Sequence, residues 1–143
     1  VNGRLEFWQD FVESNKQTNG PYAGSTANSA RWMGTGGEGN GGASVNICIS
    51  KVACRTEIYI NTGVRETNKR IYDFFFSHKN IIEKELGEMK WERLDEKVTC
   101  RISQAKDVSY LQEEEWFEIF DFFIKTTENF IATFSKVAIK YKK

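Results

Sequence analysis

The chain is short of several residue types, and each shortage excludes a class of protein. It has one proline and three cysteines in 143 residues, which excludes collagen-like chains and disulfide scaffolds and is typical of a reducing compartment. Its 20 basic and 20 acidic residues cancel to a net charge of zero, which excludes the strongly basic nucleic-acid binders. There is no run of roughly 18 apolar residues and no apolar core of a signal peptide. We therefore expect a soluble, cytoplasmic protein that does not bind membranes.

Aromatic residues are plentiful by contrast. They make up 14% of the chain, and hydrophobic residues make up 40%, which is enough for a packed core. A chain of this length buries roughly 68–70% of its unfolded surface as one unit. The sequence therefore predicts a single globular domain over residues 1–143.

Hydrophobic periodicity predicts an α+β fold. The order is one helix, three strands, one helix, two strands and a long closing helix, which favours an antiparallel five-stranded sheet covered by helices on one face. The predicted elements are a helix over 4–14, a loop over 15–30, strands over 30–34, 44–50 and 52–60, a helix over 65–86 that stops at Gly87, a hairpin over 89–94 and 98–105, and a helix over 113–140.

Side-chain spacing also predicts which faces are buried. In the first helix the expected core stripe is Leu5, Trp8, Phe11 and Val12. The strand over 52–60 alternates strictly, and its two faces are expected to lie on opposite sides of the sheet. The core face would carry Val52, Cys54, Thr56, Ile58 and Ile60, and the other face would carry Ala53, Arg55, Glu57 and Tyr59.

A glycine-rich stretch, from Gly34 to Gly42, contains six glycines in nine residues and fits the spacing GxGxxG. Dinucleotide binding needs a strand before such a loop and a helix N-terminus after it. Here a strand pattern follows instead. We interpret the stretch as the tip of a hairpin, and the sequence predicts no cofactor.

Nucleophilic and zinc sites have few candidate residues. The single histidine, His78, lies on the apolar stripe of the predicted second helix, where an imidazole is more often a core residue than a catalytic base. The one histidine and the three cysteines could together supply four zinc ligands. However, there is no CxxC pair to hold two thiolates at tetrahedral spacing. We predict no catalytic or metal-binding residues, and interpret the cysteines as small buried hydrophobic residues: Cys48, Cys54 and Cys100.

A metal-dependent nuclease of the restriction type is one alternative. It needs two acids that hold the metal and a lysine that orients water. Glu88-Met89-Lys90 has the Glu-x-Lys order, with Asp73 upstream. However, Asp73 falls inside a predicted helix and Glu88 at a turn, and the strand-borne Glu57 lacks the lysine two residues later.

The most informative polar set is expected on the sheet face away from the helices. Cross-strand Arg–Glu pairs are ordinary sheet stabilisers worth roughly some tenths of a kcal/mol. The same residues could instead bind a phosphate, a peptide or a partner domain, because Arg and Tyr are enriched at such surfaces. Both interpretations stay open, and exposed Trp32 or Trp91 would favour binding. The candidate binding residues are Arg55, Glu57, Tyr59, Arg93 and Arg101.

Two loops could close over this candidate site. The segments over 15–30 and 34–42 are rich in glycine and small polar residues, and both are expected at the sheet edge. For Arg101 an alternative stays open, since strand alternation could instead turn it toward the helices.

Five segments together resemble a known bacterial and archaeal family. They are RLEFWQDF, VACRTEIYI, NKRIYDFFFSHKNIIEKELG, MKWERLDEKVTCRIS and EEEWFEIFDFFIKTTENF. The sharpest parts are the Glu-x-Tyr-Ile strand followed by Asn68 and Lys69, the helix end before Gly87, and the hairpin that follows. These segments resemble the family called domain of unknown function 4268, over about Arg4 to Phe134. The glycine-rich tip departs from the ordinary hairpin expected there.

The resemblance implies a role without an assigned active site. Members of that family stand alone or follow a PD-(D/E)xK-type nuclease domain, which implies an accessory role linked to DNA metabolism or defence nucleases. Our favoured hypothesis is therefore a non-catalytic binding domain, with nucleic acid or a nuclease domain or other protein as partner. The alternatives are the metal-dependent nuclease and a structural homodimerisation domain. Dimerisation is suggested by aromatic residues in excess of one buried face on the last helix: Trp116, Phe117, Phe120, Phe122 and Phe123.

Overall fold

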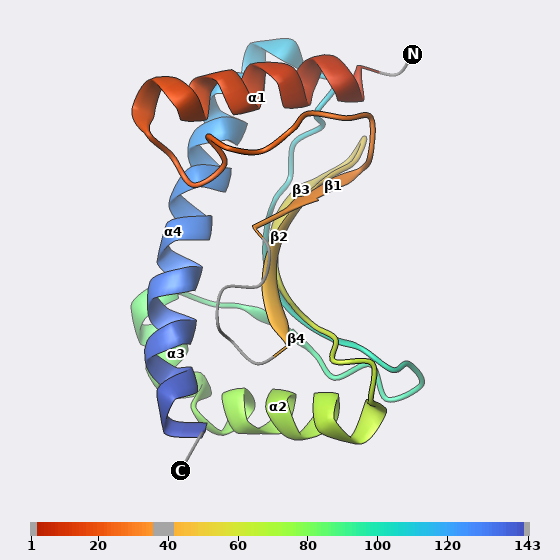
Figure 1. Ribbon diagram of the computed structural model, residues 1–143, viewed down its shortest axis with the longest axis vertical. Helices are drawn as coiled ribbons and strands as arrows, with labels where there is room; N and C mark the ends of the chain where they lie inside the picture. The colour runs from red at the N-terminus through yellow and green to blue at the C-terminus, as the bar shows by residue number, and fades with distance from the viewer. Residues whose placement is uncertain (1–2, 36–41, 142–143) are drawn as a thin grey trace.

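A computed structural model describes residues 3–35 and 42–141 of the chain. Figure 1 shows the path of the chain from the red N-terminal helix to the blue C-terminal helix. In order, the elements are α1 (Arg4–Thr18), β1 (Trp32–Gly34), β2 (Ala43–Ile49), β3 (Cys54–Ile60), α2 (Arg65–Ser77), α3 (Lys79–Leu86), β4 (Lys90–Glu92), β5 (Cys100–Lys106), a short 3-10 turn η1 (Glu113–Glu115) and α4 (Trp116–Tyr141).

The five strands form one antiparallel sheet in the order β1-β2-β3-β5-β4. Figure 1 shows α4 running along one face of this sheet, with α1 across one end and α2 across the other. The sheet bows toward α4, so the opposite face is concave (Figure 1). The α+β class and the five-stranded antiparallel sheet predicted from the sequence are thereby confirmed. The predicted helix over 65–86 is two helices, α2 and α3.

The core between sheet and helices is divided by a polar seam. One apolar cluster lies under α1 and the first half of α4, and the other lies between α2, α3 and the second half of α4. Between them the Thr56 and Thr126 hydroxyls are 2.6 Å apart, and the Tyr22 hydroxyl is 3.0 Å from that of Thr127. Each buried hydroxyl has a partner, so the seam does not carry the cost of an unsatisfied polar group.

The first helix differs from its prediction in length and in phase. Leu5 is 39% exposed, whereas Phe7, which was not in the predicted stripe, is fully buried. The helix continues to Thr18 because Asn15, placed in the predicted loop, is buried and contributes to its end. The side-chain NH₂ group of Asn15 donates to the Phe11 carbonyl at 2.8 Å, and its side-chain oxygen accepts from the backbone amide of Tyr22 at 3.0 Å. A buried asparagine therefore joins the helix end to the following loop.

The prediction for Val52 was wrong: it is 78% exposed rather than part of the core. The strand β3 begins two residues later, at Cys54. The Ser50 side chain accepts hydrogen bonds from the amides of Val52 and Ala53, at 3.2 and 3.0 Å, and donates to the Ala53 carbonyl at 2.8 Å. This local network holds a turn between β2 and β3 where the sequence had suggested continuous strand.

His78 interrupts the predicted helix over 65–86. Its backbone has φ −109° and ψ 20°, it ends α2 and begins α3, and its Nδ1 lies 3.0 Å from the Phe74 carbonyl. The stop at Gly87 is confirmed, since its φ of 87° is readily adopted only by glycine and its amide donates to the Glu83 carbonyl. Among the described helices none combines the length and apolar character of a membrane span.

Candidate functional site

The register of the sheet decides which side chains face away from the helices. In β3 these are Arg55, Glu57 and Tyr59, because the alternate residues enter the core. Arg55 lies opposite Cys48 of β2, and Tyr59 lies opposite Arg101 of β5. Arg101 therefore shares this face rather than turning toward the helices. We call the concave side of the sheet that carries these residues the outer face.

Four charged groups on the outer face form a ladder across three strands. The Glu57 side chain is 6% exposed and lies between two arginines: Arg55 Nε is 2.8 Å from Oε1, and Arg101 Nη1 is 3.8 Å from the same oxygen. On its other side Arg101 Nε is 3.2 Å from Oε2 of Glu92. A carboxylate this buried needs such partners, because an uncompensated buried charge is costly. The ladder is at least in part a structural feature of the sheet.

Cys48 also lies on the outer face, which differs from its interpretation as a buried hydrophobic residue. It is partly exposed, whereas Cys54 and Cys100 are buried in the core as predicted. Desolvation raises the pKa of the Cys48 thiol to about 12, with the nearby Glu57 carboxylate adding to the effect. At neutral pH this thiol is protonated, and only a thiolate is a good nucleophile or metal ligand.

A hollow of about 1240 Å³ lies over the outer face. Its charged lining residues are three arginines, Arg31, Arg55 and Arg101, and one carboxylate, Glu57. Trp32 stands on this face with 56% of its surface exposed. A Cβ at Gly34 would lie 2.6 Å from Oδ1 of Asn46 and 3.2 Å from Cζ3 of Trp32, so the glycine leaves room for the Asn46 side chain and for the indole. The hollow is therefore open, cationic and edged by an exposed aromatic ring.

Sequence reasoning identified part of this lining and missed the rest. The loop after α1 contributes Ser25, Thr26 and Asn28, in line with the expected position of the segment over 15–30. Of the glycine-rich stretch, Gly34 and Gly42 line the hollow, and residues 36–41 lie outside the described part of the chain. Arg31 was not singled out as a candidate, although the predicted strand over 30–34 contains it and could have placed it at the sheet.

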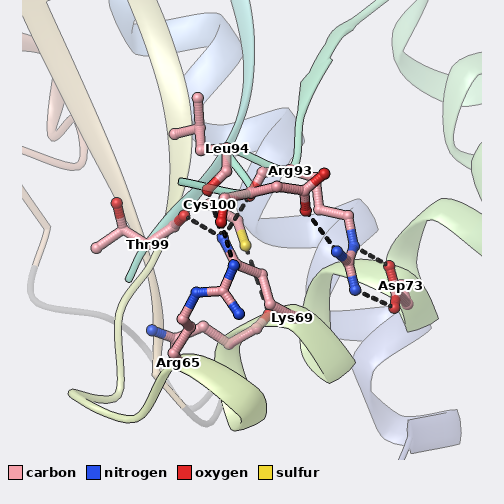
Figure 2. Close-up of polar contacts among 9 residues, drawn as sticks. Arg65, Lys69, Asp73, Arg93, Leu94, Thr99 and Cys100 are labelled. Atoms are coloured by element: carbon pink, nitrogen blue, oxygen red, sulfur yellow. Dashed lines mark hydrogen bonds and ion pairs between the residues drawn. The ribbon is translucent and has the colours of Figure 1, made fainter. Parts of the chain in front are cut away.

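Arg93 lies apart from the other candidate residues. It follows β4, and its guanidinium turns to α2, where Nε and Nη2 are 2.9 and 3.0 Å from the two carboxylate oxygens of Asp73 (Figure 2). A third nitrogen contacts Asp95 at 2.5 Å. Donation by Arg93 lowers the pKa of Asp73 below its ordinary value. Trp91 likewise leaves the outer face, since it packs against the core and donates to Glu83 at 2.9 Å.

The contacts of Asn68 and Lys69 show what this pair does after the Glu-x-Tyr-Ile strand. The Lys69 side chain is buried, and the amine donates to the carbonyls of Arg93, Leu94 and Thr99 at 2.5, 2.8 and 2.9 Å (Figure 2). The neighbouring Asn68 donates to the Val98 carbonyl at 2.8 Å. Both side chains thus join α2 to the loop between β4 and β5. Their role in the structure is to hold this hairpin.

The nuclease alternative receives no geometric support. Asp73 is bound by Arg93 on α2, while Glu57 is held by Arg55 and Arg101 on the outer face. Over residues 3–35 and 42–141 no group of three or more His, Cys, Asp or Glu side chains could hold a metal ion. Two of the acids that the alternative requires, Asp73 and Glu57, are therefore engaged in separate ion pairs.

The aromatic residues at the start of α4 are largely accounted for by the core. Phe120 and Phe123 are buried, and Trp116 and Phe122 pack against the same cluster. Phe117 is 80% exposed. The dimerisation hypothesis stays a prediction, and its aromatic argument now rests on this residue.

Fold and site together define the class: an α+β protein with helices on one face of an antiparallel sheet and an arginine-lined hollow on the other. A family model confirms the resemblance and covers most of the chain. The protein belongs to the family described as domain of unknown function (DUF4268), whose model matches residues 3–138. Neither the search of curated proteins nor the search of solved structures found a match.

Proposed function

We propose that this chain is a non-catalytic binding domain whose outer-face hollow holds an anionic ligand. The observation that carries the proposal is the charge of the lining, where three arginines accompany one carboxylate. Glu57 and, beside the hollow, Glu92 balance the charges of Arg55 and Arg101, so the uncompensated positive charge of the lining is that of Arg31. Arg31 is exposed and has no ion-pair partner among the described residues. A neutral protein can attract anions through such a local excess of positive charge.

The shape of the hollow favours a segment of a larger molecule. Its volume of about 1240 Å³ exceeds the roughly 300–1,000 Å³ of typical small-molecule pockets. It is spread over the outer face of β1, β2 and β3 rather than enclosed. The implied family link to nuclease domains and DNA metabolism is consistent with such a ligand, and we include it in the proposal together with a cytoplasmic location.

Binding of inorganic polyphosphate, measured by calorimetry at low salt, tests the proposal. We expect Arg31→Ala to weaken binding several-fold without a change in melting temperature, because the side chain is exposed. Arg70→Ala is the matched control, since Arg70 is exposed on α2 away from the hollow. Equal effects of the two variants, or no binding by the wild-type protein, would show that the hollow is not an anion site.

The paired arginines need a second readout. Arg55→Ala and Arg101→Ala each remove a partner of the buried Glu57, so both are expected to lower the melting temperature. They support the proposal only if affinity falls at a temperature where the variant is fully folded. If both lose stability while affinity is unchanged, these two arginines are structural.

A further inference from the structure

We infer that the anionic ligand is a single strand of nucleic acid, with bases stacked on Trp32 and Tyr59 and phosphates beside the arginines. This inference rests on the proposed function and adds the chemistry of the ligand. It comes from the aromatic residues of the outer face, which the anion site alone does not explain.

Trp32 differs from the other tryptophans of the chain. Three indole N–H groups donate to acceptors within the fold: Trp8 to the Ala30 carbonyl, Trp91 to Glu83 and Trp116 to the Tyr110 carbonyl. Trp32 instead presents its ring on the outer face with 56% exposure. A large aromatic ring left in water beside a polar hollow contributes little to the fold, whereas it offers a surface on which a base can stack.

Aromatic and cationic side chains alternate across this face. Trp32 lies opposite Cys48, which lies opposite Arg55, so Trp32 and Arg55 share one row across the sheet. Tyr59 lies directly opposite Arg101. Each aromatic ring therefore has an arginine in its own row. This pairing of a base platform with a phosphate-binding group is the combination by which single-stranded nucleic acids are held.

The spacing of the two rings sets the length of strand required. Neighbouring strands of a sheet lie about 4.8 Å apart, and successive residues are about 3.3 Å apart along a strand. Trp32 and Tyr59 are two strands apart across the sheet and four residues apart along the strand direction. Their Cα positions are therefore separated by roughly 16 Å. At about 3.4 Å per stacked nucleotide, and more when the strand is extended, about three to six nucleotides span both rings.

Other anionic polymers fit the face less well. A duplex keeps its bases stacked within itself, so the rings would have no base to receive. An acidic peptide would neutralise the arginines but has no planar group for Trp32 and Tyr59. Open sheet faces that carry exposed aromatic residues bind single strands in this way in RNA-recognition modules, which is an analogy of geometry alone.

The test compares three probes by fluorescence anisotropy at low salt: an oligothymidylate of about ten nucleotides, an abasic deoxyribose-phosphate strand of equal length, and polyglutamate. We expect the oligothymidylate to bind at least about tenfold more tightly than the abasic strand, because stacking contributes that much per base. The corresponding oligouridylate distinguishes RNA from DNA, and preference for either supports the inference.

Variants locate the effect. Trp32→Ala should lower affinity for the oligothymidylate about tenfold, and Trp32→Phe should restore most of it while the melting temperature stays constant. Phe117→Ala, which removes an aromatic ring that is 80% exposed on α4, should leave affinity unchanged.

Three results would overturn the inference, and they differ in what they mean for the proposed function. Equal affinity for the oligothymidylate and the abasic strand, or no effect of Trp32→Ala, refutes base stacking while an anion site remains. Tighter binding of polyglutamate identifies an acidic peptide as the ligand. No binding of any of these probes or of polyphosphate refutes the anion site itself.

Discussion

Removal of the buried lysine of α2 is expected to be among the most damaging single changes in the protein. In Lys69→Met the alkyl stem is kept, while three hydrogen bonds to the carbonyls of Arg93, Leu94 and Thr99 are lost. An unsatisfied buried acceptor costs about 1–3 kcal/mol. Since Arg93, Leu94 and Thr99 are only half-buried, water can reach some of these oxygens. We expect a loss of about 3 kcal/mol, which is a large share of the about 5–15 kcal/mol that stabilises a typical domain.

Urea denaturation monitored by circular dichroism measures this loss of stability. Since each kcal/mol shifts the melting temperature by about 3 °C in a domain of this size, we expect the melting temperature to fall by about 10 °C. Amide hydrogen exchange should accelerate most over residues 93–99, where the hairpin is held. Lys125→Met is the matched control. Its amine makes one exposed ion pair with Asp121 at 3.2 Å, which is worth at most about 0.5 kcal/mol. If Lys69→Met costs no more than Lys125→Met, the three hydrogen bonds do not stabilise the fold as argued.

Two further predictions follow from the shifted pKa values of Glu83 and Cys48. Hydrogen bonds from the Trp91 indole and the Met89 amide lower the pKa of Glu83, so its stabilising effect is present above the ordinary carboxyl pKa of about 4.5 and is lost as pH falls through the lowered value. Glu83→Ala should therefore cost about 1 kcal/mol near pH 6 and less near pH 3, as measured by urea midpoints, and an equal cost at both pH values would contradict the assignment. The raised pKa of Cys48, about 12, predicts slow reaction of the folded protein with a disulfide reagent at pH 8. Glu57→Gln should accelerate that reaction, and rapid labelling of the folded wild-type protein would refute the prediction.

Local periodicity was sufficient to predict much of the sheet. In a strand, successive side chains point to opposite faces whatever the rest of the protein does. This alternation correctly assigned Arg55, Glu57 and Tyr59 to one face of the sheet. It failed at Val52 because the Ser50 side chain ends the strand pattern with a turn. Periodicity specifies a strand only where no competing side-chain hydrogen bond is available.

Properties that depend on distant segments could not be predicted. The phase of α1 is set by the aromatic cluster that surrounds Phe7, which includes Trp116 and Phe120 of α4. Arg93 stands one residue beyond β4, so the sheet register no longer directs it and Asp73 attracts it toward α2. Lys69 bonds to carbonyls 24 to 30 positions later in the chain. Such contacts exist only after the chain has folded.

The most direct test of the central claim is an NMR titration of the indole N–H signals with the oligothymidylate. The chain has four tryptophans, and the Trp32 signal is identified by its absence from the Trp32→Phe variant. Trp8 is fully buried, and Trp91 and Trp116 are partly buried with their N–H groups bound within the fold. A single strand on the outer face should shift the Trp32 signal and leave the other three in place. If the oligothymidylate binds while the Trp32 signal stays fixed, the outer face is not the binding site.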